Sequence, residues 1–192
     1  MMKCQKTIVV LVFISIVSLT AVYLSQPSLW FNKKNAKTNS DCVTAQTEKT
    51  VRGSSMEPLI KAGQTLILLE NYYQCHPVQR GDIVAYNYAG NDVPIIKIVK
   101  AIPGDSWRIK KEYQQNSYQI IVNDKPLKNS EGKYYQIPES NIKMLKLYAK
   151  SYPLLPDNTY LILGNNISGS LDATRFGLVS KSDILGKVEV CR

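Results

Sequence analysis

The chain has 192 residues, a formal net charge of +9, and 44% hydrophobic and 20% charged residues. This composition fits one globular domain with a short additional segment, and the sequence contains no repeat or low-complexity tract. Five of the nine excess charges are lysines in residues 1–40, where no acidic residue occurs, and the other four are spread over residues 41–192. Because these lysines flank a hydrophobic segment and form no arginine-rich run, they favour contact with anionic membrane lipid and argue against nucleic-acid binding.

Residues 7–24 are a hydrophobic run whose only polar side chains are Ser, Thr and one Tyr. Eighteen residues of helix span roughly 27 Å, close to the hydrocarbon thickness of a bilayer. We therefore predict a short cytoplasmic tail at 1–6 and a transmembrane anchor at 7–24, extended to about residue 31 by an interfacial Trp-Phe pair. A cleavable signal peptide is the alternative, but no Ala-x-Ala cleavage motif follows the run. The flanking lysines do not decide the orientation of the anchor.

The remainder of the chain is predicted to be a polar linker at 32–47 and a folded domain at 48–192. In this domain, short apolar runs rich in Ile, Val and Tyr are bounded by Gly, Pro, Asn or Asp, which is typical of strands. We expect short helices only at 141–149 and 181–185. The pattern predicts a mostly β domain with an antiparallel sheet. The predicted strands are residues 65–69, 82–88, 95–102, 117–122, 159–163 and 187–190.

The cysteines lie at positions 4, 42, 75 and 191, and none of them forms a Cys-x-x-Cys motif. The only histidine, His76, follows Cys75, and adjacent residues on a strand point to opposite faces. Structural zinc needs four converging ligands, so we predict no metal site, and nothing indicates a cofactor. If the domain is exported, Cys42, Cys75 and Cys191 can form at most one disulfide, and the sequence does not choose the pair.

The single histidine also limits the catalytic possibilities. A Ser-His-Asp triad or a Cys-His dyad needs a histidine placed as a base, and His76 is followed by a proline. A hydrolytic nucleophile in this chain would therefore use a lysine or a carboxylate as its base. Residues 51–58 (VRGSSMEP) place a glycine before paired serines, which permits an unusual backbone, although the same composition is also that of an ordinary polar turn.

Lys97 has two aliphatic residues on each side, in the sequence IIKIV. On a strand it is flanked by apolar side chains whichever face it occupies, and its ammonium is costly there unless it is paired or neutral. Neutrality at pH 7 requires its pKa to fall from about 10.4 to below about 7, and burial can produce a change of that size. A neutral lysine can accept the proton of a serine hydroxyl. The alternative is an edge-strand lysine that reaches water, as we expect for Lys100, which faces the other way.

Four motifs in order resemble those of the type I signal peptidases, over residues 51–190. Residues 53–58 (GSSMEP) resemble the nucleophile motif of that family, whose catalytic serine precedes Met and corresponds to Ser55. Residues 80–84 (RGDIV) resemble the family's Arg-Gly-Asp strand. Lys97 stands eight residues before Asp105 of a Pro-Gly-Asp motif, where the family places its base. The last motif is matched by Gly164, Asn166, Ser170 and Asp172, followed by Phe176-Gly177 and Gly186-Lys187.

The resemblance implies a β-sheet catalytic domain of signal-peptidase type, with Ser55 as the nucleophile and Lys97 as the general base. It implies that Ser170 hydrogen-bonds the Lys97 amine, that Asp172 supports the same loop, and that the backbone around Gly53 and Ser54 contributes to the oxyanion hole. The implied substrates are signal peptides of exported preproteins, with small residues at P1 and P3, bound as an added β-strand. The implied enzyme is a monomer, single-pass in the plasma (inner) membrane, with its catalytic domain on the outer side.

Some positions depart from the family pattern. Asn165 stands where the family commonly has Asp, Arg175 is displaced by one position, and Ile98 follows the base lysine where arginine is frequent. These changes predict a rewired network around Asp172. Gly53 replaces a serine whose hydroxyl assists the oxyanion hole in some members, and losing one such donor can cost about 10²–10³ in rate.

Three alternatives remain open on the sequence. A conjugation-type peptidase that processes a pilin precursor would share the Ser-Lys pair. A LexA-like self-cleaving switch also uses Ser and Lys on a β domain, but it should carry a DNA-binding helical domain where this chain has a hydrophobic segment. A non-catalytic membrane-anchored homologue would agree with the altered last motif.

Overall fold

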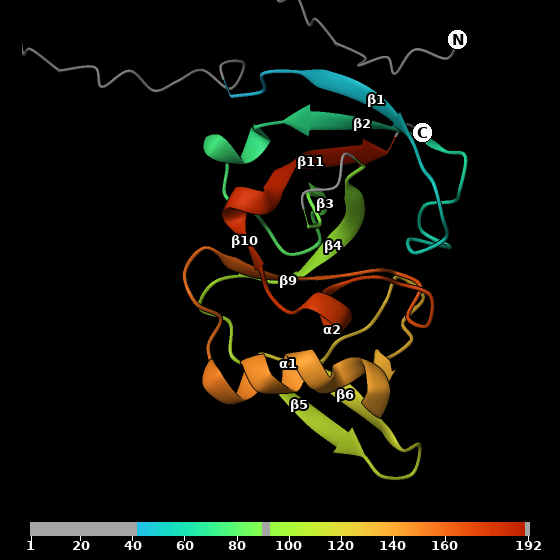
Figure 1. Ribbon diagram of the computed structural model, residues 1–192, viewed down its shortest axis with the longest axis vertical. Helices are drawn as coiled ribbons and strands as arrows, with labels where there is room; N and C mark the ends of the chain where they lie inside the picture. The colour runs from blue at the N-terminus through green and yellow to red at the C-terminus, as the bar shows by residue number, and fades with distance from the viewer. Residues whose placement is uncertain (1–41, 90–92, 191–192) are drawn as a thin grey trace, which may run out of the picture.

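The computed structural model describes residues 42–89 and 93–190, which form two antiparallel sheets with the two α-helices between them in the view of Figure 1. The larger sheet has the strand order β1-β2-β11-β3-β4-β9-β10. Its strands are β1 (Gln46–Thr50), β2 (Thr65–Glu70), β3 (Ile83–Tyr86), β4 (Ile95–Ala101), β9 (Thr159–Leu163), β10 (Val179–Ser180) and β11 (Ile184–Val190). The mostly β, antiparallel fold predicted from the sequence is therefore confirmed.

The smaller sheet is inserted between β4 and β9 in the chain. It consists of β5 (Trp107–Glu112), β6 (Ser117–Val122), β7 (Lys125–Pro126) and β8 (Gln136–Pro138). The helix α1 (Glu139–Ser151) lies across this sheet, at the opposite end of the molecule from β1, and α2 (Ala173–Phe176) lies between α1 and β9 (Figure 1). Two 3-10 turns, η1 (Tyr72–Gln74) and η2 (Lys181–Asp183), complete the fold.

All six predicted strands are present, but some elements differ from the prediction. The helix expected at 181–185 is only the 3-10 turn η2, after which residues 184–185 already belong to β11. The domain also begins earlier than residue 48, since β1 starts at Gln46. β1 and β5 escaped prediction because charged and polar residues, in the sequences QTEKT and WRIKKE, hide their alternation.

The predicted tail at 1–6, the anchor at 7–24 and most of the linker lie outside the described residues. Among the residues that the structure describes, no helix is long and apolar enough to cross a membrane.

An apolar core inside the larger sheet positions the serine loop, residues 51–60. Met56 and Ile60 of this loop are buried, with exposed fractions of 2% and 0%. They pack against side chains from four strands: Leu66, Leu68, Ala85, Ile98 and Val188. Burying two large side chains contributes on the order of 1.5–3 kcal/mol each, so the loop is held to the sheet at two points, directly after Ser55 and near the end of the loop.

A disulfide joins Cys42 and Cys75, whose Cα atoms are 5.8 Å apart. Of the three pairs that the sequence leaves open, the structure therefore selects one. The bond ties the chain just before β1 to the end of η1, and so fixes the point at which the chain enters the domain.

Removing this bond by Cys42→Ser should lower the free energy of unfolding by about 3–4 kcal/mol, because the disulfide closes a loop with a sequence separation of 33 in the unfolded chain. The measurement is denaturant unfolding of the oxidised protein, with disulfide mapping by mass spectrometry. The matched control is Cys191→Ser, which should leave stability unchanged. A mapped bond to Cys191, or equal stability of the Cys42 variant and the wild type, would contradict the assignment.

Candidate catalytic site

The structure brings Ser55 and Lys97 together from different parts of the chain. Lys97 Nζ donates a hydrogen bond of 3.0 Å to Ser55 Oγ and one of 2.7 Å to the carbonyl oxygen of Ile96. Lys97 lies on β4 opposite Val84 of β3, and only 2% of its surface is exposed. The serine comes from a loop and the lysine from a strand interior, so the pair depends on how that loop is held against the sheet.

Burial lowers the pKa of Lys97 from its ordinary value of 10.5 to about 8, and the negative charge of Asp172 partly opposes this change. The charged amine is disfavoured because the surrounding side chains replace water without offering an ion-pair partner in contact with it. The decrease is smaller than the sequence argument required for a mostly neutral amine at pH 7. With a pKa of about 8, about one lysine in ten is neutral at that pH.

The second lysine of β4 does not behave as expected. Lys100 was predicted to be solvated, but it is half-buried and its Nζ donates 2.9 Å to the carbonyl oxygen of Lys128. A register irregularity between Val99 and Ala101 interrupts the regular alternation of β4. Burial also lowers the pKa of Lys100, although it lies away from Ser55 and contacts the ring of Tyr135.

The serine loop leaves backbone donors available around Ser55. Gly53 has a φ of +81°, which a glycine adopts without strain. Ser54 is exposed, and its carbonyl oxygen accepts from Glu57 N at 3.1 Å. Within residues 42–89 and 93–190, the backbone N–H of Ser55 donates to no acceptor. An N–H beside the nucleophile can stabilise an oxyanion, and Gly53 offers no side-chain donor to assist it.

Asp172 is buried, with 3% of its surface exposed, and three donors satisfy it. Its Oδ2 accepts from Gly164 N at 2.8 Å, and its Oδ1 accepts from the N–H and the hydroxyl of Thr174 at 3.0 and 2.7 Å. It caps the N-terminus of α2 and fixes the loop that precedes the helix. Thr174, which sequence reasoning did not single out, supplies two of these donors, while Arg175 is exposed.

Ser170 does not form the hydrogen bond to Lys97 that the family resemblance implied. Its Oγ is buried and has no hydrogen-bond partner among the described residues. It lies directly over Gly164, where an added Cβ would collide with Ser170 and would come within 2.7 Å of the Ser55 carbonyl oxygen. Gly164 is therefore required by the close approach of these two loops.

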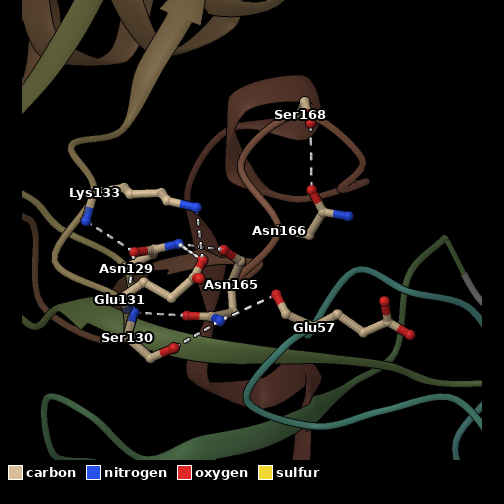
Figure 2. A network of polar contacts seen from close by, with 8 residues as sticks. All are labelled: Glu57, Asn129, Ser130, Glu131, Lys133, Asn165, Asn166 and Ser168. Carbon is tan, nitrogen blue, oxygen red and sulfur yellow. Dashed lines mark hydrogen bonds and ion pairs between the residues drawn. The ribbon is translucent and has the colours of Figure 1, made fainter.

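The loop after β9 is bonded to the serine loop through its backbone and side chains. Asn166 N donates 3.0 Å to the carbonyl oxygen of Ser55, and its Nδ2 donates 3.3 Å to that of Ser54. Asn165 is fully buried and donates to the carbonyl oxygen of Glu57 (Figure 2). Sequence reasoning matched Asn166 to a motif but assigned no partner to Asn165, because its contacts come from distant parts of the chain.

Two of the sequence motifs have structural roles beside the site. Arg80 forms an ion pair with Asp105, which also accepts from Ile102 N and Asn123 Nδ2, both near 2.9 Å. Although burial favours its neutral form, these hydrogen bonds, foremost that from Arg80, hold the pKa of Asp105 below its usual value. The Arg-Gly-Asp and Pro-Gly-Asp motifs are thus joined to each other, and they fix the end of the β3–β4 pair at which β3 begins and β4 ends.

A cleft of about 440 Å³ opens at the Ser55–Lys97 pair. One wall is formed by residues 48–52 and the other by residues 93–97, and the floor is apolar: Met56, Leu66, Leu68, Ala85 and Val188. β1 pairs only with β2, and β4 pairs with β9 only from Ile98 onward. Both walls therefore carry strand edges without a strand partner in the described part of the chain, where an extended peptide can add.

No three His, Cys, Asp or Glu side chains converge to hold a metal ion within the residues that the structure describes.

Comparison with known proteins places this geometry in context. Residues 42–192 match the family model described as "Signal peptidase, peptidase S26". The chain is 30% identical over 158 residues to signal peptidase IB of Staphylococcus aureus (strain N315), covering 74% of this chain and 75% of the relative. It is 24% identical over 140 residues to the inactive signal peptidase IA of S. aureus (strain Mu50), covering 73% and 75%. A signal peptidase I structure from Enterococcus faecalis V583 aligns with 19% identity and a TM-score of 0.41, covering 58% of this chain and 97% of the other.

The buried amine can be tested through stability. Lys97→Met should raise the free energy of unfolding at pH 7 by up to about 3 kcal/mol, because it removes an ammonium that is costly to bury. In the wild type, stability should rise with pH between about 8 and 10.5, since there the unfolded lysine keeps the proton that the folded one has lost. The variant should lack this rise.

The measurement is urea unfolding of both proteins across pH 7–11. Lys110→Met, at a lysine 61% exposed, is the control and should leave the pH dependence as in the wild type. A flat wild-type profile, or a Lys97→Met protein less stable than the wild type at pH 7, would show that the amine is solvated.

Proposed function

Because this chain belongs to the signal peptidase family, peptidase S26, and is a serine peptidase of signal peptidase I type, we propose that it removes signal peptides from exported preproteins, with Ser55 as nucleophile and Lys97 as general base. One observation carries the assignment of these residues. The lysine amine that contacts Ser55 Oγ, at 3.0 Å, belongs to a side chain that is 2% exposed and has a lowered pKa. This combination is what a lysine base requires.

In the proposed mechanism, neutral Lys97 accepts the proton of Ser55 while Oγ forms a bond to the carbonyl carbon of the scissile peptide. The C–N bond then breaks, and the leaving amine takes the proton from Lys97. A water molecule deprotonated by the same amine hydrolyses the acyl-enzyme and regenerates Ser55. The backbone N–H of Ser55 belongs to the nucleophile itself and donates to no acceptor in the described residues. It is therefore free to donate to the oxyanion that forms on the substrate.

Ser170 is proposed to orient the base. A neutral amine has two N–H groups and one lone pair, and the lone pair must face the Ser55 hydroxyl. The carbonyl oxygen of Ile96 takes one N–H, which leaves one N–H without an acceptor among the described residues. Ser170 Oγ is a buried hydroxyl that also has no partner there, so it is the proposed acceptor for this N–H in the reacting enzyme, although the two groups are not bonded in the structure. Asp172 keeps that loop in place through Gly164.

The substrate is proposed to bind as an extended strand in the cleft beside Ser55. The open edges at residues 48–52 and 93–97 offer backbone groups to a peptide, and the apolar floor favours small apolar side chains at alternate positions. Small residues at P1 and P3 of a signal peptide agree with this arrangement.

We further propose a monomer that is anchored by residues 7–24 in the plasma membrane, in contact with lipid, with residues 42–192 on the outer side. The Cys42–Cys75 disulfide supports this location, since such bonds persist in oxidising compartments. The hydrophobic run and its flanking lysines support the anchor.

A non-catalytic homologue is the second candidate, because one of the relatives is named as inactive. The contact between Ser55 and Lys97 favours an active enzyme over this alternative. The purified protein separates these possibilities. A signal peptidase cleaves secretory preproteins, a conjugation-type peptidase cleaves only a pilin precursor, and a non-catalytic homologue cleaves neither.

Ser55→Ala and Lys97→Met should each abolish cleavage of a secretory preprotein, with a loss of at least about 10³-fold in kcat, because each removes one half of the proton transfer. Cleavage is followed by gel electrophoresis with the full chain in detergent. Lys100→Met, on the same strand but bonded to Lys128, is the matched control and should keep wild-type activity. Activity within tenfold of wild type in either Ser55→Ala or Lys97→Met would contradict the mechanism. Cleavage of a pilin precursor alone would favour the conjugation-type peptidase.

The pH dependence follows from Lys97. Between pH 5 and about 8, kcat/KM should rise about tenfold per pH unit and then level off, because only the neutral amine can accept the proton of Ser55. Initial rates across pH 5–10, with a substrate that lacks ionisable groups near the cleavage site, give the profile. A plateau that begins below pH 6 would mean that a different group acts as the base.

A further inference from the structure

The side-chain amide of Asn165 joins the serine loop to a second loop beside the site. It is fully buried, its Nδ2 donates 3.1 Å to the carbonyl oxygen of Glu57 and 2.9 Å to Ser130 Oγ, and its Oδ1 accepts from Ser130 N at 2.9 Å. Figure 2 shows the amide between the serine loop and the loop at 129–133. Both hydrogens of the amide and its oxygen are therefore used, by groups from two distant segments.

The loop at 129–133 is itself rigidly bonded. Asn129 Oδ1 accepts from the N–H groups of Glu131 and Lys133, both at 3.0 Å, and Asn129 Nδ2 donates 3.2 Å to the carbonyl oxygen of Asn165 (Figure 2). The side chains of Glu131 and Lys133 form an exposed ion pair of 3.2 Å. Asn165 is thus held by its backbone and by its side chain to a loop that closes on itself.

Asn165 and Asn166 also bond the serine loop close to the nucleophile. Residues 165 and 166 donate to the carbonyl oxygens of Ser54, Ser55 and Glu57. Since Met56 and Ile60 fix the loop only from the side of the sheet, these three bonds are the polar contacts that hold it from the side of β9.

We propose that Ser130 and Asn165 are positioning residues that brace the serine loop and set the distance between Ser55 Oγ and Lys97. The proposal rests on the proposed function for the meaning of that distance. It accounts for an amide at 165, where the family pattern commonly has an aspartate. One partner here is a carbonyl oxygen, which needs a donor, and a carboxylate would meet it with an acceptor.

Ser130 and Asn165 should affect the rate of the reaction more than the binding of the substrate. Residues 48–52 and 93–97 line the cleft, whereas Ser130 and Asn165 do not. A displacement of about 1 Å between reacting groups can cost about 10²-fold in rate. Losing the brace should therefore lower kcat and leave KM nearly unchanged.

The decisive variant is Asn165→Asp in the full chain. Its carboxyl can donate to the Glu57 carbonyl when protonated and cannot when ionised, so the ratio of variant to wild-type kcat should fall as pH rises, to a loss of about 10–10²-fold at pH 8. The charged groups of the segments bonded to this position are Glu57, Glu131 and Lys133, and Asp172 and Lys97 bond the neighbouring Gly164 and Ser55. All are common to both proteins, so the ratio removes their contribution to first order.

Ser130→Ala should lower kcat about tenfold at every pH, and Lys133→Gln, which breaks only the exposed ion pair of the same loop, is the matched control and should be active as wild type. The double variant with Asn165→Asp should lose less than the product of the single losses. A pH-independent ratio for Asn165→Asp, or Ser130→Ala within twofold of wild type, would overturn the proposal. Should Asn165→Asp fail to fold, Ser130→Ala and the control decide alone.

Failure of the proposed function is recognised separately. If the wild type cleaves no preprotein, the brace is measured by the rate at which a penem acylates Ser55, which needs no natural substrate. The same ordering, with wild type and Lys133→Gln equal and Ser130→Ala about tenfold slower, is expected there. Equal acylation rates for all of these proteins would overturn the brace.

Discussion

The arrangement depends on one contact, a hydrogen bond between a buried lysine amine and a serine hydroxyl. Removing the amine from water costs about 3 kcal/mol, judged from the difference between a pKa of about 8 and its ordinary value of 10.5. That cost is large beside a net stability of about 5–15 kcal/mol. The surroundings of Lys97 therefore have to be rigid, because a loosened strand would let the ammonium reach water and recover its usual pKa.

The sheet and its linked motifs provide that rigidity. β4 is paired on one side along the whole segment that carries Lys97, and the Arg80–Asp105 ion pair fixes the turn at its far end. Asp82 binds Lys187 of β11 at 2.9 Å, which ties the neighbouring strand into the same unit. Residues that look like a catalytic signature in the sequence are here the supports of the strand that buries the base.

The sequence predicted what depends on local pattern and missed what depends on distant partners. The six apolar strands follow from alternation and β-branched composition, and the exceptional place of Lys97 follows from four aliphatic neighbours. β1 and β5 could not be predicted because their stability comes from paired neighbours, not from their own charged sequences. The Cys42–Cys75 disulfide and the hydrogen bonds of Asn165 each join segments far apart in the chain. A pattern within one segment therefore could not predict them.

The base and the nucleophile are held in place by different interactions, and this difference explains which positions can vary. The base sits on a strand, where backbone pairing and apolar burial leave little freedom. The nucleophile sits on a loop, held by two buried side chains and by hydrogen bonds to carbonyl oxygens. Hydrogen bonds to a carbonyl can be supplied by a backbone N–H or by a side-chain amide. Positions on the loop side can therefore vary as long as a donor still faces each carbonyl oxygen, as Asn165 does for Glu57, whereas a second charge beside Lys97 would change the pKa on which the chemistry depends.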